Sequence, residues 1–360
     1  MCGTKRPTIS VVIPVYNDER YIRAAIEALL AQTYPNELTE IIVVDDGSTD
    51  GTASIVKEYD TVKYLHQTNQ GPSAARNFGA LEAHGKLVAF TDSDCEPDPD
   101  WLERLVEIFE ADKTGRLATV GGVQRGHPDD NAYARKVDAL LCAIGIVADY
   151  VKPNKHISHV SHNASCNSCY SRNLYMAAGG FRPSMFPGED VDLDKRLKDA
   201  GYTVLFTPQA AVKHHRADTP KRFKRMLLSY GSSSAYNVIT HGLFRIIHLA
   251  PIAILMAAIA LPAAVATGAL GIWPSSLPAA LCLGLVVCWI RKKSGLGFSD
   301  SATLAALTAI LFTYGFWKFF IDFFRVSRPD TRKRLEPIAD TSEPNSKTNI
   351  VDTLRKGSVY

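Results

Sequence analysis

The N-terminal part of the chain predicts an α/β fold with a Rossmann-like, mostly parallel central sheet and flanking helices. Short apolar strands alternate there with amphipathic helical segments, which is typical of β–α–β units. Two of the apolar runs, residues 41–44 and 87–90, lead directly into pairs of carboxylates. The carboxyl ends of parallel strands meet at one edge of an open sheet, and such folds bind ligands at that edge. The sequence therefore predicts a polar site there.

The elements follow in a regular order through residues 9–109. The first strand, residues 9–17, stops at Pro14 and Asn17, and a helix from Glu19 to about Gln32 carries an apolar stripe. Further strands are expected at residues 41–46, 62–65 and 87–92. Between them, Asp50 caps one expected helix and residues 70–73 precede another. A last helix begins near Trp101.

Polar side chains stand at three of these strand ends. The pairs are Tyr16/Asn17, Asp45/Asp46 and Asp92/Asp94. In a strand, residues i and i+2 share one face, so Asp92 and Asp94 are expected to converge on one site. Paired carboxylates suit Mg²⁺ or Mn²⁺ held together with substrate phosphates. The alternative is an Asp-rich turn that caps the following helix.

Composition bounds the function further. A length of 360 residues predicts about two domains, and a net charge of +3 argues against a bulk nucleic-acid binder. The seven cysteines are scattered, as expected for a reduced protein, although Cys166 and Cys169 have the spacing of a redox or zinc motif without a second pair. Neither a dinucleotide-binding Gly-x-Gly-x-x-Gly loop nor a P-loop sequence is present.

Six segments in order make the prediction specific. The chain resembles the family 2 glycosyltransferases of GT-A fold over roughly residues 8–230, and the segments that carry the resemblance are residues 11–17, 43–50, 71–79, 92–94, 179–181 and 188–193. The resemblance implies a nucleotide-sugar half, residues 8–115, and an acceptor half, residues 116–218, within a domain of residues 1–218. It also implies sugar transfer with inversion.

The resemblance assigns roles to the donor-side residues. Pro14, Tyr16 and Asn17 would line the nucleobase pocket and Asp46 would accept a hydrogen bond from the base. Asp92 would lie near the ribose. Asp94 would hold a divalent cation, Mn²⁺ or Mg²⁺, that bridges the diphosphate and assists the leaving group. Arg76 is expected either beside the diphosphate or in a structural salt bridge.

The acceptor half contains the predicted catalytic carboxylates. Glu189 and Asp190 precede a helix expected over residues 191–200, where carboxylates are favoured as caps as well. The resemblance makes Asp190 the base that deprotonates the acceptor hydroxyl and gives Glu189 a supporting role. Upstream, residues 131–150 predict a helix and residues 152–162 a loop that covers the acceptor.

A histidine pair follows the last predicted strand, residues 204–206. Neighbouring side chains in an extended segment point apart, so only one histidine can face the site. The spacing in the family favours His214 as a further metal or diphosphate contact, with His215 as the alternative. Residues 225–231 lack the Gln-x-x-Arg-Trp segment of the processive family members, which indicates a non-processive enzyme.

The C-terminal part predicts a membrane anchor. Residues 219–245 read as a basic amphipathic helix on an anionic membrane surface. No Asp, Glu, Lys or Arg occurs between Arg245 and Arg291, which predicts a hairpin of spans near 246–270 and 275–290 within a membrane region of residues 246–326. A third apolar segment, residues 302–324, either crosses or lies in the interface. Residues 327–360 predict a disordered tail.

These predictions combine into one principal hypothesis. The protein is expected to be a multi-pass inner-membrane enzyme with its catalytic domain in the cytoplasm, because basic residues flank both ends of the hairpin. Its expected partners are a UDP-, GDP- or dTDP-sugar donor, a glycan, lipid-linked or small-molecule acceptor, and membrane lipids, with no nucleic acid. Two alternatives stay open: a sugar-1-phosphate nucleotidyltransferase, and a catalytically inactive nucleotide-sugar-binding membrane protein.

Overall fold

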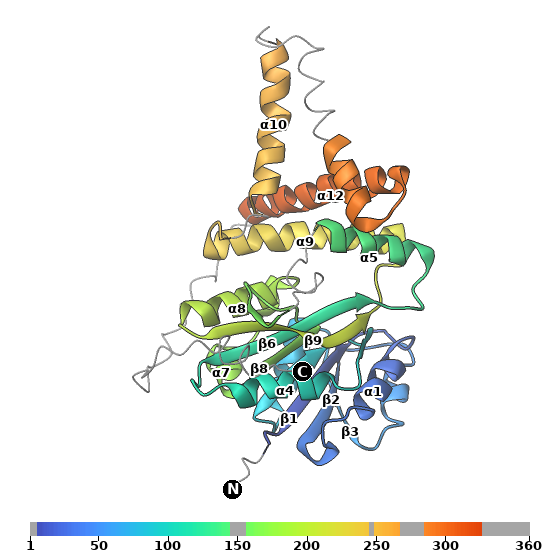
Figure 1. Cartoon of the computed structure of the whole chain (residues 1–360), viewed down its shortest axis with the longest axis vertical. Helices are drawn as coiled ribbons and strands as arrows, with labels where there is room; N and C mark the ends of the chain where they lie inside the picture. Colours follow the sequence, from blue (N-terminus) through green and yellow to red (C-terminus); the bar gives the residue numbers. More distant parts are fainter. Residues whose placement is uncertain (1–5, 145–155, 245–247, 267–283, 326–360) are drawn as a thin grey trace. The chain divides into compact units, whose positions relative to one another are not determined.

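The computed structural model describes residues 6–144, 156–244, 248–266 and 284–325 (Figure 1). The described residues form two units, one of residues 6–128 and 156–215, the other of residues 129–144 and 216–325. Helix α5 (Ala132–Ile144) was expected in the acceptor half but belongs to the second unit.

The first unit is built on a nine-stranded sheet, and the N-terminal strands form its parallel half. Its order is β3 (Val62–His66), β2 (Thr39–Asp45), β1 (Ile9–Val15) and β4 (Leu87–Thr91). All three pairings are parallel, with Val15 beside Asp45 and Val12 beside Phe90. All residues of β1 and β4 are buried, as their mostly apolar sequences predict.

The other half of the sheet is mixed, so the expectation of a mostly parallel sheet is wrong beyond β4. Strand β8 (Asn167–Ser171) lies antiparallel between β4 and β6 (Leu117–Gly126). Strand β9 (Thr203–His214) is parallel to β6 and antiparallel to β5 (Cys95–Pro97) and β7 (Ser158–His159). Strand β7 lies within the expected loop 152–162, of which residues 152–155 are outside the described part. The sequence of β8, Asn-Ser-Cys-Tyr-Ser, is mostly polar and shows no clear strand alternation, although its first four residues are buried.

Helices cover both faces of the sheet. One face packs against α1 (Ile22–Leu30), α2 (Thr52–Val56) and α4 (Trp101–Ala111). The other packs against α3 (Pro72–Leu81), α7 (Arg172–Ala177) and α8 (Glu189–Asp199). Single turns of 3₁₀ helix, η1 (Asn36–Leu38) and η2 (Pro183–Met185), precede β2 and α8. The alternation of apolar residues along β1 and β2 divides them between these two cores.

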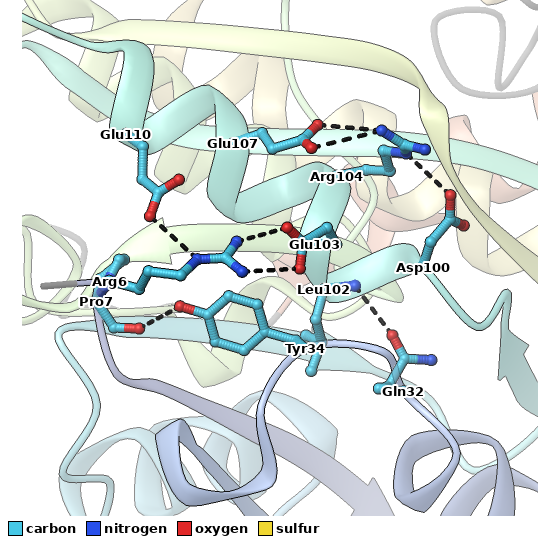
Figure 2. Close-up of polar contacts among 10 residues, drawn as sticks. All are labelled: Arg6, Pro7, Gln32, Tyr34, Asp100, Leu102, Glu103, Arg104, Glu107 and Glu110. Carbon is cyan, nitrogen blue, oxygen red and sulfur yellow. Dashed lines mark hydrogen bonds and ion pairs between the residues drawn. The ribbon is translucent and has the colours of Figure 1, made fainter. Parts of the chain in front are cut away.

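Polar contacts fix the segment before β1 to α4 (Figure 2). The Arg6 guanidinium donates to both carboxylate oxygens of Glu103, at 3.1 and 2.6 Å, and lies 4.5 Å from the centre of the Tyr34 ring. The Tyr34 hydroxyl donates to the carbonyl of Pro7 at 2.6 Å. The side chain of Gln32 accepts from the backbone N–H of Leu102 at 3.0 Å, so it satisfies a donor in the first turn of α4.

The described part of the second unit is helical. It comprises α5, α9 (Pro220–His241), α10 (Leu249–Ala266), a helix over residues 284–294, and α12 (Phe298–Arg325). Thr219 caps α9 by accepting from the N–H of Arg222, and Pro220 opens the helix. Helices α9 and α12 pack closely at Gly231, where a Cβ would overlap the carbonyl oxygen of Phe312.

Among the described residues, one helix is long and apolar enough to cross a membrane, Phe298–Asp322 in α12. The first expected span corresponds in part to α10, whereas the hairpin's turn and part of its second span lie outside the described residues, as does the predicted tail. Lys318 and Asp322 form an ion pair on α12.

Candidate functional site

The parallel strands β2, β1 and β4 end at one edge of the sheet and bring the three predicted polar pairs to it. Pro14 is buried within β1. Tyr16, directly after the strand, exposes 51% of its surface, so its ring is free to stack on a ligand. Asn17 has a φ of 50°, and its side-chain oxygen accepts from the N–H of Thr49 at 2.7 Å. Asn17 is exposed, and its side chain supports the loop after β2.

The carboxylates after β2 organise the loops around this edge. Asp45 accepts from the N–H of Ser48 and from the Tyr64 hydroxyl. Asp46 is 2% exposed and accepts three hydrogen bonds, from the side chain of Gln67 at 2.7 Å and from the N–H groups of Gln70 and Gly71, each at 2.8 Å. In this structure Asp46 holds the loop that precedes α3.

Arg76 on α3 lies between two carboxylates from distant parts of the chain. Its guanidinium donates to Asp92 at 2.6 Å and to Glu189 at 2.9 Å, and the Arg76 and Glu189 side chains are each 2% exposed. Arg76 thus makes salt bridges within the protein, whereas a position beside the diphosphate stays a prediction. The bridges link the donor-side carboxylate to the first residue of α8.

Burial and the neighbouring charges together raise the pKa of Glu189 above its usual value. Burial raises it most, and the neighbouring Asp190 raises it further, whereas Arg76 lowers it, so that the pKa reaches about 7. The carboxyl of Glu189 also accepts from the N–H of Gly188 at 2.9 Å. Glu189 is thus a buried residue with no exposed face for an acceptor, which fits a supporting role.

Asp190 is the partly exposed member of the pair. Its carboxylate accepts from the N–H of Ser165 at 3.2 Å and from the N–H of Val191 at 2.7 Å. The N-cap position of α8 is Gly188, so Asp190 stands inside the first helical turn. The predicted start of the helix at residue 191 is two residues late, and Asp190 is not the N-cap residue.

Two further acids of α8 were not singled out from the sequence. Asp192 is fully buried between Arg182 and Arg196. Asp194 accepts from the N–H of Asn163 at 2.7 Å and from the Tyr170 hydroxyl at 2.9 Å. Burial raises the pKa of Asp194 to about 8. From the sequence, α8 looks like an acidic, solvent-exposed helix, and the two-residue spacing of Asp192 and Asp194 does not indicate that both are buried.

Asp94 and His214 come together as predicted. The Nε2 of His214 lies 3.5 Å from a carboxylate oxygen of Asp94, and its Nδ1 lies 3.0 Å from the side-chain oxygen of Gln124. Burial opposes ionisation of Asp94, but His214 outweighs it and lowers the carboxyl's pKa. Burial likewise opposes the charged form of His214, and Asp94 overcomes it and raises the pKa of His214 to about 10.

The adjacent histidine belongs to a second group of side chains. His215 stacks between Tyr21 and His127, with ring centres 4.3 and 3.9 Å away. His127 Nε2 lies 3.0 Å from a carboxylate oxygen of Glu96, and Glu96, His127 and His215 together could hold a metal ion. His214 and His215 thus join different groups, as expected for neighbours in a strand. Glu96 and His127 were missed, because their proximity depends on the pairing of β5, β9 and β6.

Cysteines complete the surroundings of Asp94 and were not predicted there. Cys95 and Cys166 are both buried and group with His214. A hydrogen bond from Cys95 lowers the pKa of the Cys166 thiol most, and the pKa falls to about 7 despite burial. Cys166 is therefore partnered with Cys95, 71 positions away, and not with Cys169 of the sequence motif.

Part of the chain is similar in sequence to known glycosyltransferases. Residues 10–177 match the family model "Glycosyl transferase family 2". The chain is 33% identical over 205 residues to the glycosyltransferase AglE of Haloferax volcanii, covering 56% of this chain and 64% of AglE. It is 34% identical over 248 residues to the pre-mycofactocin glycosyltransferase of Mycobacterium tuberculosis, covering 66% of this chain and 49% of that enzyme. The chain thus spans less than two thirds of the length of each relative.

A solved structure shares the fold. The mannosyltransferase PcManGT from Pyrobaculum calidifontis, described in complex with GDP-Man and Mn²⁺, aligns with a TM-score of 0.61 over 88% of each chain at 23% identity. This likeness supports the GT-A-like α/β fold predicted from the sequence, with a mixed sheet. Residues 10–177 thus resemble the glycosyl transferase family 2 domain in sequence, and the likeness to PcManGT concerns the fold.

Proposed function

We propose that the protein transfers a sugar, with inversion, from a nucleoside-diphosphate sugar to a hydroxyl of a glycan, lipid-linked or small-molecule acceptor. One observation carries most of the weight beyond the family match. Arg76 ties Asp92, at the end of the donor strand, to Glu189, the neighbour of the candidate base Asp190. The donor-side and acceptor-side carboxylates therefore belong to one buried network.

The donor would bind along the edge of β2, β1 and β4. The exposed ring of Tyr16 is suited to stack on the base, and Pro14 shapes the wall behind it. Asp46 already accepts three hydrogen bonds, so its contribution to base recognition is to fix the backbone of residues 67–71. Asp92 has a side chain that is 28% exposed and one oxygen on Arg76, which leaves the other oxygen for the ribose.

A divalent cation fits beside Asp94. The Asp94 carboxylate is about one third exposed, carries a lowered pKa, and has an imidazole nitrogen of His214 within 3.5 Å. Oxygen and imidazole donors of this kind suit Mn²⁺ or Mg²⁺. When bound, such a cation neutralises charge on the departing nucleoside diphosphate. PcManGT is described with Mn²⁺, which supports this assignment.

Asp190 is the proposed general base. As the acceptor oxygen forms a bond to the sugar's C1, the bond from C1 to the diphosphate oxygen breaks and the hydroxyl proton passes to the Asp190 carboxylate. The N–H of Ser165 orients this carboxylate. Glu189, buried against Arg76, fixes the first turn of α8 and so the position of its neighbour.

The proposal extends to a location at the cytoplasmic face of a membrane. It is supported by the long apolar helix in α12, by the uncharged stretch from residue 246 to 290, and by exposed basic residues near the start of α9. Lys221, Arg222, Lys224 and Arg225 are all exposed there and are suited to anionic lipid headgroups.

The test uses the full chain purified in detergent. It is incubated with a panel of UDP-, GDP- and dTDP-sugars, with and without Mn²⁺ or Mg²⁺, and release of the nucleoside diphosphate is measured. We expect cation-dependent release from one donor class, lost in Asp94→Asn. Release from none of the donors, or equal release by the variant, would count against the proposal.

A further inference from the structure

Four side chains around the end of β4 form a compact group with two sulfur atoms. Cys95, Cys166 and His214 each offer a ligand atom, and these three atoms lie within 4.8 Å of one another. Asp94 adds a fourth, because its Oδ1 lies 3.8 Å from the Cys95 sulfur and 3.5 Å from His214 Nε2. Cys95 is 0% and Cys166 5% exposed.

The spacing of these atoms is close to that of a tetrahedral zinc site. Zinc bonds of about 2.3 Å to sulfur and about 2.0 Å to nitrogen or oxygen place the ligand atoms roughly 3.3–3.8 Å apart. The distances from Asp94 Oδ1 to Cys95 Sγ and to His214 Nε2 lie within this range, so small side-chain rotations would bring the four ligand atoms into tetrahedral positions. Two thiolates, an imidazole and a carboxylate form a donor set that favours zinc over magnesium or manganese.

The histidine is already oriented for such a site. Its Nδ1 lies 3.0 Å from the side-chain oxygen of Gln124, which is 5% exposed. A hydrogen bond from Nδ1–H to Gln124 orients the ring so that Nε2 faces Asp94 and the thiols, and a metal bound there takes the place of the Nε2 proton. Metal-binding histidines are commonly held in this way by a second side chain.

We infer that Cys95, Cys166, His214 and Asp94 form a binding site for a thiophilic divalent cation such as Zn²⁺. The site differs from the proposed catalytic one in its sulfur ligands, yet it takes the same Asp94 carboxylate. When Zn²⁺ is bound by the two thiolates, it also occupies Asp94 and His214. These two residues are then not available to the Mn²⁺ or Mg²⁺ that binds with the nucleotide. Binding of Zn²⁺ is inhibitory, and this consequence, unlike the binding itself, rests on the proposed function.

Cadmium is a suitable probe, because cadmium–thiolate bonds absorb in the ultraviolet. The full chain, in detergent with a non-thiol reductant, is titrated with Cd²⁺ and then with Zn²⁺ as competitor. Cys95→Ser and Cys166→Ser each remove one sulfur, and Cys166→Ala is a second variant in case the serine fails to fold. Cys169→Ser is the matched control, because Cys169 is a buried cysteine of the same strand region outside the group.

We expect about one equivalent of Cd²⁺ to give a thiolate band that Zn²⁺ displaces. The band should be at least halved in the Cys95 and Cys166 variants and unchanged in the Cys169 control. An undiminished band in folded Cys95 and Cys166 variants would overturn the site, as would binding that His127→Gln abolishes, since that result assigns the metal to the Glu96 group. The absorbance does not depend on sugar transfer, so its outcome is separable from the failure of the proposed function.

Activity measurements then test the consequence. In each variant, nucleotide release with Mn²⁺ is compared with and without added Zn²⁺, so that any effect of the substitution on basal rate cancels. We expect Zn²⁺ to inhibit the parent and the Cys169 control, and Cys166→Ser to lose most of that sensitivity. Equal inhibition of all three proteins would refute competition at Asp94 even if the thiolate band is present.

Discussion

Replacing Arg76 with methionine tests the network that joins the two halves of the site. The substitution keeps most of the side-chain volume but removes the only cation that contacts both Asp92 and Glu189 among the described hydrogen bonds and ion pairs. Breaking a buried ion pair by removing one partner costs about 3–5 kcal/mol. At about 2–4 °C per kcal/mol for a unit of this size, the melting temperature should fall by roughly 6–20 °C.

The loss should depend on pH, because Glu189 can take up a proton. Its pKa is already raised to about 7, and Arg76 is a contribution that lowers it. Without Arg76 the pKa rises further, and the neutral acid avoids the cost of a buried, unpaired charge. A carboxyl whose pKa is higher in the folded than in the unfolded state destabilises the fold as pH rises from about 4.5 through the folded pKa. Arg76→Met should therefore be less damaging at pH 5 than at pH 8.

Thermal unfolding of the full chain in detergent measures both effects, and Arg76→Met/Glu189→Gln is the matched double variant. Glutamine has the shape of the protonated acid, so the double variant should recover part of the lost stability at pH 8 and little at pH 5. An equal loss at the two pH values, with no recovery in the double variant, would refute the reasoning. Arg6→Met is a control, because the Arg6 guanidinium is one third exposed and its ion pairs are worth much less.

Three further predictions concern other parts of the chain. Asp190→Asn keeps an acceptor for the N–H of Ser165 and should melt near the parent, but lower transfer by about 10² or more; near-normal transfer would leave Asp190 a structural residue. Asp194→Asn should flatten the decline in melting temperature between about pH 4 and pH 8, because the raised pKa of Asp194 makes its ionisation destabilising in that range; an unchanged pH profile would contradict this. Gly231→Ala should destabilise the α9–α12 packing by about 1–3 kcal/mol, measured by thermal unfolding, whereas Gly284→Ala, whose Cβ meets nothing within 4 Å, should not.

The parallel half of the sheet was predictable because its evidence is local. Each of β1, β2 and β4 contains a run of at least three apolar residues, and the polar residues at their carboxyl ends lie at the shared edge because of strand geometry. Strand geometry likewise predicts that His214 and His215, as neighbours in an extended segment, point to opposite sides. The resemblance then supplied the roles of these residues.

The mixed half was not predictable in the same way. β8 is short and polar, and it lies between β4 and β6 because it pairs with residues 47 to 84 positions away in the sequence. The buried acids of α8 lie opposite partners such as Asn163 and Tyr170, which no periodicity identifies. A helix with this many carboxylates is expected to be exposed to solvent, and only the tertiary structure shows that several of them are buried.

Arg76 shows that a sequence motif can place a residue on an element without defining its contacts. The sequence placed it on a helix near the donor edge and left open whether it contacts phosphate or protein. Only the fold brings Glu189, 113 positions away, to within 2.9 Å of its guanidinium. Because two carboxylates neutralise the charge of the buried Arg76 guanidinium, Arg76 contributes to the site mainly by holding these carboxylates in position. It fixes the first turn of α8 relative to the end of β4, and hence the proposed base, Asp190, relative to the proposed donor site. A shift at the end of β4 or at the start of α8 is then transmitted to the other carboxylate, so we expect the Arg76 variants to alter transfer as well as stability.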